Sequence, residues 1–300
     1  MNKKIKIIDQ DIVFLSYDEP NAEENYVDLL NKVPWAKRVH GVKGSDAAHK
    51  ACAAISDTEY FTTVDADNII EPDYLNVEID FDELGLDESY VFSWCGRIHV
   101  NGLEYGNGGL KLWTREFVNN MKTHENALPH DERNKVEFCF DQRYYQFNER
   151  YSESFTNSTP FQAWRAGFRE GVKMGLDQGF KVDDLRKVWR QNYRRLLIWC
   201  TIGADVKNGL WSVYGARQGL HMAYCTDWDY ANVRDFEYLK TLFDETKPNT
   251  DSDLNNEIVR LGDIIRSSLR LEIADLDANG SKFFKSTVTH IPRRLKGGAD

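Results

Sequence analysis

The sequence predicts an α/β protein in which a parallel sheet is followed by a helical region, and three observations support this. Residues 6–64 alternate β-branched, apolar runs with amphipathic runs, which is the pattern of strands joined by helices. Residues 161–199 repeat apolar side chains at three- and four-residue spacing, which is typical of helices. The 300 residues are 41% hydrophobic and include 20 glycines and 7 prolines, so the composition is that of a globular protein.

The first part of the chain contains strand and helix patterns in alternation. In chain order they are a strand over 6–16, a helix over 22–33, a short strand over 36–42, a helix over 46–55 with Ser45 as its N-cap, and a strand over 60–64. Ligands of open α/β sheets bind beyond the carboxyl ends of the strands. We therefore expect the binding site at residues 16–19 and 65–68.

A second β element follows at residues 90–105. Residues 90–100 predict a strand, Asn101-Gly102 a tight turn, and residues 103–105 the returning strand. The glycine-rich segment 106–111 is either a plain loop or a place where backbone approaches a ligand closely. Further on, residues 251–276 contain an amphipathic helix that we expect to serve packing only.

Charge is unevenly distributed along the chain. The net charge of -10 argues against a protein that coats nucleic acid or membrane. Residues 161–200, however, carry 9 basic against 4 acidic side chains. We expect two helices there, the second capped by Asp183 or Asp184, that form a hairpin with basic stripes. The stripes consist of Arg165, Arg169, Lys173, Arg186, Arg190 and Arg194. Such a surface either is solvated and pairs with the acidic remainder or docks nucleic acid or another phosphate-bearing ligand.

Membrane and disulfide classes are not indicated. The sequence has no apolar run long enough to cross a bilayer, and its start lacks the apolar core of a secretory signal. Its 5 cysteines include no CxxC pair, so neither a disulfide framework nor structural zinc is predicted. We expect a soluble, cytoplasmic protein with no membrane partner.

The segment TTVDADN carries the sharpest chemical signal. It delivers Asp65 and Asp67 at the end of a predicted strand, followed by Asn68. Alternate side chains of a strand point the same way, so the two carboxylates suit a hard cation, Mn²⁺ or Mg²⁺, that also binds phosphate oxygens. Taken alone, such an acidic pair could equally cap a helix.

The order of these segments resembles the nucleotide-sugar-binding half of GT-A glycosyltransferases, especially of family 2, over roughly residues 8–145. The resemblance implies a GT-A fold, Rossmann-like with a mixed central sheet, over residues 1–155. It further implies an added helical, acceptor-side region over 156–280 and a basic, partly disordered tail over 281–300. The implied donor-binding residues are Ser16, Tyr17, Asp18, Glu19, Asp46, Lys50, Asp65, Gly108 and Gly109. Where the family usually has A-R-N before the third strand, this chain has AHK at 48–50.

The same resemblance implies a mechanism. Asp65 and Asp67 would bind the metal, and His221 would be a third ligand. Asp141, at the end of an apolar segment, would be the general base that takes the proton of the acceptor hydroxyl, with Glu137 or Asp131 as fallbacks. The reaction would be inverting, with a UDP-type nucleotide sugar as donor.

The acceptor is indicated by segments 159–179 and 202–219, which resemble glycosyltransferases of tailed phages that carry hydroxymethylated cytosine in their DNA. This implies that a sugar, glucose or arabinose, is attached to 5-hydroxymethylcytosine, that the basic stripes contact DNA phosphates, and that the protein works in the host cytoplasm if a phage encodes it. The alternatives are a polysaccharide or lipid-linked glycan acceptor, or a non-catalytic nucleic-acid-binding protein. A haloacid-type phosphatase or a sugar nucleotidyltransferase fits less well, because the D-x-D follows the third strand and SYDEPNAEE is not a G-x-G-T-R-like loop.

Overall fold

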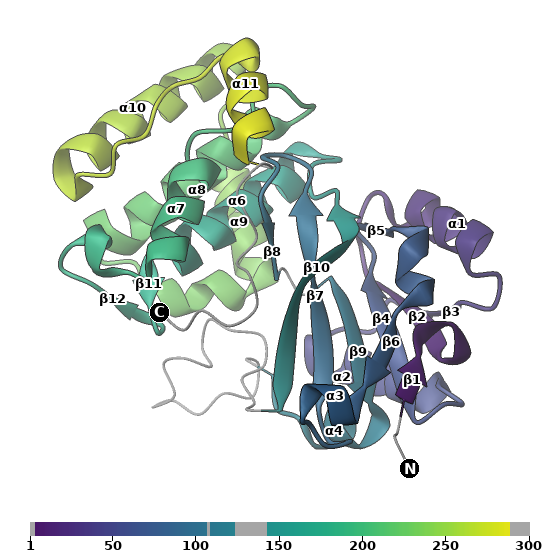
Figure 1. Ribbon diagram of the computed structural model, residues 1–300. Coiled ribbons are helices and arrows are strands. Elements are labelled where there is room, and N and C mark those ends of the chain that lie inside the picture. Colours follow the sequence, from purple (N-terminus) through teal and green to yellow (C-terminus); the bar gives the residue numbers. More distant parts are fainter. Residues whose placement is uncertain (1–3, 107–108, 124–142, 289–300) are drawn as a thin grey trace.

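A computed structural model describes residues 4–106, 109–123 and 143–288 of the chain. An α/β part packs beside a group of helices formed by the C-terminal half (Figure 1). The main sheet has the order β3-β2-β4-β9-β7-β10-β5, with β8 paired to β7. Its strands are β2 (Asp11–Ser16), β3 (Lys37–His40), β4 (Tyr60–Asp65), β5 (Asn68–Ile70), β7 (Val91–Ile98), β8 (Glu104–Tyr105), β9 (Leu110–Thr114) and β10 (Tyr144–Ser154).

The sheet is mixed. β2 pairs in parallel with β3 and with β4, whereas β9 runs antiparallel to both β4 and β7. β7 and β10 are again parallel, and β5 closes the sheet antiparallel to β10. The predicted fold class, α/β with a mixed central sheet and an added C-terminal helical region, is confirmed.

Two details of the N-terminal half differ from prediction. The apolar run 6–16 is not one strand: it is divided into β1 (Lys4–Lys6), a 3-10 turn η1 (Ile7–Asp9) and β2, and β1 pairs with β6 (Glu78–Asp80) in a separate ribbon. Ser45 is the first residue of helix α2 (Ser45–Ile55) and not its N-cap, which is Gly44 at a φ of 94°. Glycine tolerates that left-handed backbone at no steric cost. Helix α1 (Ala22–Lys32) and the β7–β8 hairpin form where expected.

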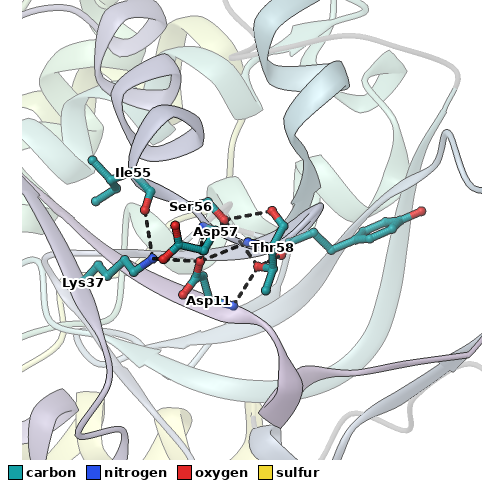
Figure 2. Close-up of polar contacts among 7 residues, drawn as sticks. Asp11, Lys37, Ile55, Ser56, Asp57 and Thr58 are labelled. Atoms are coloured by element: carbon teal, nitrogen blue, oxygen red, sulfur yellow. Dashed lines mark hydrogen bonds and ion pairs between the residues drawn. The ribbon is translucent and has the colours of Figure 1, made fainter.

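A polar cluster fixes the amino end of the parallel strands (Figure 2). The Lys37 ammonium of β3 donates to Asp11 Oδ2 at 3.0 Å, to Asp57 Oδ2 at 2.7 Å and to the Ile55 carbonyl at 2.9 Å. Asp11 also accepts hydrogen bonds from the Ser56 hydroxyl and the backbone N–H of Thr58. These groups come from β2, β3 and the loop before β4. The cluster therefore fixes how the three strands are positioned along their length relative to one another.

Six α-helices of 10 to 19 residues form the described part of the helical region. These are α6 (Pro160–Met174), α7 (Arg190–Trp199), α8 (Gly209–Cys225), α9 (Phe236–Thr246), α10 (Asp251–Leu269) and α11 (Ala278–Val288). Glycines allow α6 and α8 to cross closely: a Cβ at Gly167 would lie 1.9 Å from the Ser212 carbonyl oxygen, and one at Gly215 would lie 2.2 Å from that of Trp164. This crossing fixes the orientation of α6.

The predicted second helix of the basic hairpin is shorter than expected. Strands β11 (Leu176–Asp177) and β12 (Phe180–Lys181) and a 3-10 turn η4 (Leu185–Lys187) precede α7, which begins only at Arg190. Asp184 does cap a helix, but it caps η4, by accepting from the Arg186 backbone N–H. The apolar spacing over 185–199 therefore combines a 3-10 turn with an α-helix.

Part of the segment predicted as a tail forms a helix. Residues 281–288, assigned above to the tail, belong to α11, which Ser281 and Lys285 attach to the core. The Ser281 hydroxyl accepts from the Ala204 N–H at 3.1 Å, and Lys285 forms an ion pair with Asp205 at 2.8 Å in which both side chains are 12% exposed. Across the residues described, no helix has the length and apolarity to span a membrane.

Candidate functional site

A cavity of about 690 Å³ lies at the carboxyl edge of the parallel strands, where the fold class predicts a ligand. One wall is the ends of β2 and β4, and a second is the loop before α2 with that helix's first turns. The third wall comes from the helical region: α6, the turn η5 (Tyr230–Arg234) and the start of α9. The volume suits a ligand of nucleotide size.

The cavity brings together residues that are distant in sequence. Those predicted as site residues that line it are Ser16, Tyr17, Asp18, Glu19, Asp65, Asp67, Arg165, Arg169 and Lys173. Because α6 belongs to the segment 156–280, the helical region contributes directly to the same cavity as the sheet.

Asp65 and Asp67 line the cavity with partly buried side chains, and the positive groups near them do not offset the cost of burying their charge. Burial, with Asp65 and Glu19 nearby, raises the pKa of Asp67 to about 7. Burial also raises the pKa of Asp65, although the charge of Lys111 opposes the change. Asn68 donates to Asp67 Oδ1 at 2.6 Å, which holds that carboxylate in place. A bound cation would stabilise the negative charge of these two carboxylates.

The residues fit an open Mg²⁺ or Mn²⁺ site. Within the described part of the chain no three His, Cys, Asp or Glu side chains form a complete protein metal site. Mg²⁺, however, is commonly held by one or two carboxylates together with substrate phosphates. Asp65 and Asp67 supply those carboxylates, while Asn68 is buried, does not line the cavity and serves to hold Asp67.

Lys111 and His49 line the cavity and were not predicted. Lys111 of β9 lies opposite Thr63 of β4, on the same face of the sheet as Asp65. His49 Nδ1 lies 2.8 Å from the Ser45 carbonyl, and burial beside Lys111 lowers its pKa to about 3, so the ring is neutral. The available signal for Lys111 was a lone cation within the apolar run LKLW.

Asp46 and Lys50, predicted to bind the donor, do not line the cavity. The Lys50 ammonium donates to Asp46 Oδ2 at 2.7 Å across one turn of α2. The helical position was predicted correctly, but the spacing of four residues pairs the two side chains with each other.

The six basic residues predicted as one surface divide into two groups. Arg165, Arg169 and Lys173 face the cavity. The guanidinium carbons of Arg165 and Arg169 each lie 4.9 Å from the ring centroid of Phe236. Arg165 also acts electrostatically on Asp67. We call these three residues of α6 the cavity cations. The others, Arg186, Arg190 and Arg194, do not line the cavity and are exposed, and Arg186 forms an ion pair with Asp184. The residues between α6 and α7 separate the groups.

His221 is not brought to the aspartates. It lies on α8 beside Glu257 and Arg260 of α10 and does not line the cavity. Its place in the sequence could not show which face of α8 it occupies, and that face packs toward α10.

The glycine loop is described only in part. A Cβ at Gly109 would lie 2.3 Å from Asn68 Nδ2, so this glycine lets the loop approach Asn68, and its carbonyl accepts from the Asp65 N–H at 3.0 Å. Gly108, the predicted base Asp141 and the fallbacks Glu137 and Asp131 lie outside the described residues.

Comparisons with known proteins give only distant structural similarity. No protein-family profile matches the sequence, and no curated protein is similar to it. A glycosyltransferase involved in glycosylation of the major capsid of PBCV-1 aligns with a TM-score of 0.29 and 14% identity, over 50% of this chain and 94% of that one. The mannosyltransferase PcManGT from Pyrobaculum calidifontis, in complex with GDP-Man and Mn²⁺, aligns with a TM-score of 0.32 and 10% identity, over 85% and 86%. HddC from Yersinia pseudotuberculosis aligns with a TM-score of 0.24 and 17% identity, over 46% and 68%. Scores this low carry no argument about function, so the inferences below depend on the site itself.

Proposed function

We propose that this protein is a metal-dependent glycosyltransferase that moves a sugar from a nucleoside-diphosphate donor, of the UDP type, to a hydroxyl acceptor with inversion. One observation carries the proposal: a single cavity at the carboxyl edge of the sheet holds the paired carboxylates Asp65 and Asp67 opposite the cavity cations Arg165, Arg169 and Lys173.

This arrangement of charge suits a diphosphate. Two carboxylates alone would repel a diphosphate, but they can hold a divalent cation that binds its oxygens, and when bound that cation neutralises the leaving group. The cavity cations approach from the facing helix and stabilise the same negative charge as the bond to the sugar breaks.

Residues at the carboxyl end of β2 would hold the nucleoside. Tyr17 is 43% exposed and lines the cavity, so its ring is available to a base, and Asp18 beside it offers a carboxylate to ribose hydroxyls. Ser16 also lines the cavity, but its side chain is buried and its hydroxyl accepts from Arg38 Nε at 3.0 Å, so we assign it to support of the loop. The proton of the acceptor hydroxyl would pass to Asp141, which remains the predicted base.

For the acceptor we propose 5-hydroxymethylcytosine in DNA. Arg190 and Arg194 remain available for phosphates once the cavity cations are assigned to the donor, whereas Arg186 is paired with Asp184, and Trp189 beside them is 52% exposed, as is useful for contact with an unstacked base. A glycan acceptor would not require this group. We therefore assign residues 1–155 to the nucleotide-sugar core and 156–280 to a region that serves both donor and acceptor.

The proposal is tested first by binding. Thermal shift with UDP-glucose, UDP-arabinose and GDP-mannose, each with Mn²⁺ or with EDTA, should show stabilisation by one of them only when the metal is present. Slow hydrolysis of that donor and transfer to a hydroxymethylated oligonucleotide should follow. Metal-independent binding would reject the metal-dependent donor site, and DNA binding with no donor hydrolysis would favour a non-catalytic nucleic-acid-binding protein. Transfer to an oligosaccharide but never to DNA would support the glycosyltransferase and reject the DNA acceptor.

A further inference from the structure

A third carboxylate in the cavity, Glu170, has no role in the function proposed so far. It follows Arg169 on α6 and lines the cavity, yet its side chain is only 17% exposed. A carboxylate placed between two cavity cations weakens phosphate binding at that point, so its presence there calls for a different ligand group.

Glu170 is held by groups from two other elements. The Tyr105 hydroxyl of β8 donates to Glu170 Oε2 at 2.6 Å, and the indole Nε1–H of Trp199 on α7 donates to the Tyr105 oxygen at 3.2 Å. Both rings are buried. Because the indole can only donate, the single tyrosine proton is directed to Glu170. The carboxylate is therefore fixed in orientation before any ligand binds.

The surroundings keep Glu170 ionised. Burial alone would raise its pKa, but Lys173, the hydrogen bond from Tyr105, and the charges of Arg169 and Arg195 together hold the pKa below its usual value. The Lys173 ammonium lies 3.5 Å from Oε1. An ionised carboxylate accepts hydrogen bonds and donates none, and a lowered pKa makes it a poor proton acceptor. Hydroxyl groups are its natural ligands.

The adjoining wall of the cavity also offers an acceptor. Gly106 follows Tyr105, and a Cβ there would lie 2.2 Å from Gln146 Oε1. The Gln146 amide nitrogen donates to the carbonyls of Ser93 and Phe147, which leaves its oxygen as an acceptor, and Gln146 lines the cavity. Arg165, which acts electrostatically on Asp67, is five residues before Glu170, about 7.5 Å along the helix axis, so the two side chains reach different parts of the cavity.

We propose that Glu170, oriented by Tyr105 and Trp199, is a specificity-determining residue that accepts hydrogen bonds from hydroxyls of the donor sugar. The inference rests on the proposed function and deepens it: the transferred group is a neutral, hydroxyl-rich sugar, and a uronic acid is disfavoured because its carboxylate would face Glu170.

Titration calorimetry with Mn²⁺ on the full chain tests this by comparing bare and sugar-bearing nucleotides. The probes are UDP with UDP-glucose, UDP-arabinose and UDP-glucuronate, and GDP with GDP-mannose. Glu170→Gln should weaken the preferred neutral nucleotide sugar about tenfold, the effect of losing a charged hydrogen bond, while the bare diphosphate binds within about twofold of wild type. It should also reduce the discrimination against UDP-glucuronate.

Two further variants separate recognition from folding. Tyr105→Phe keeps Glu170 but releases its orientation, and it should give a smaller loss confined to the sugar-bearing ligand. Glu257→Gln removes a carboxylate that pairs with Arg260 outside the cavity, and it should change neither affinity. Equal losses for bare and sugar-bearing nucleotide, or no loss for either, would overturn the assignment of Glu170. A wild-type protein that binds neither would overturn the proposed function itself, and this inference with it.

Discussion

Carboxylates at the two ends of the same parallel strands have opposite electrostatic surroundings. At the amino end, Asp11 accepts from Lys37, from the Ser56 hydroxyl and from backbone N–H groups; burial opposes ionisation, but these partners hold its pKa below the usual value. At the carboxyl end, burial raises the pKa of both Asp65 and Asp67. The first arrangement stabilises the fold, whereas the second leaves negative charge that a bound cation would stabilise. The contrast separates a structural cluster from a functional site on one sheet.

Removal of the two carboxylates at the carboxyl end, Asp65 and Asp67, should have the largest effect. The double variant Asp65→Ala, Asp67→Ala should lower Mn²⁺-dependent nucleotide affinity by at least about a hundredfold, because the cation loses both protein ligands. Calorimetry with UDP and Mn²⁺ measures the loss. Affinity equal to that of wild type would place the metal elsewhere.

The matching change at the amino end should affect stability and leave binding intact. Asp11→Asn should lower the free energy of unfolding by about 2 kcal/mol, since Lys37 loses a charge partner that is itself only 12% exposed. Urea unfolding measures this at neutral pH, where the carboxylate is ionised. The metal-dependent affinity for UDP should stay within about twofold; a large loss would show that the two ends are not independent.

In contrast to Asp11→Asn, the variant Asp67→Asn should raise the free energy of unfolding of the metal-free protein. The folded pKa of about 7 lies above the ordinary aspartate value of 3.8, so the folded state binds more protons between these values and the wild type loses stability as pH rises from about 4 to 7. The gain should be about 1 to 2 kcal/mol at pH 8 and absent at pH 4. Urea unfolding in EDTA at both pH values measures it. A destabilised variant at pH 8 would mean that the carboxylate is already compensated.

Charge reversal should separate the two basic groups. Arg169→Glu should weaken Mn²⁺-dependent UDP binding about tenfold, because Arg169 lines the cavity. Arg190→Glu, on the exposed group, should leave UDP binding unchanged but raise the apparent KM for hydroxymethylated DNA and flatten its salt dependence. The reverse pattern, with Arg190→Glu alone affecting UDP, would contradict the division made here.

The smallest effect is expected at His221. Since this ring lies beside Glu257 and Arg260 and does not line the cavity, His221→Ala should change the Mn²⁺ affinity by less than about twofold. A manganese titration followed by thermal shift is sufficient. A tenfold loss would return His221 to the set of metal ligands.

Local sequence was sufficient for the elements whose patterns are short-range. Apolar runs, helical spacing and a glycine-containing turn predicted β4, α1 and the β7–β8 hairpin, and strand ends predicted where Asp65 and Asp67 would lie. The pattern failed where one apolar run served two structures, as at 6–16 and 185–199, because 3-10 turns interrupt both without a change in hydrophobicity.

The sequence by itself therefore determined the fold class, the acidic pair at the end of the third predicted strand, and the presence of basic residues late in the chain. Only the tertiary structure decided which of these meet. Two packing features orient Arg165, Arg169 and Lys173 toward the aspartates. One is the close crossing of α6 and α8, and the other is the relative position of the parallel strands, which is fixed at Asp11 and Lys37. They also bring Tyr105 and Trp199, ninety-four positions apart, together behind Glu170. Periodicity specifies the face of a helix, but what that face meets depends on long-range packing.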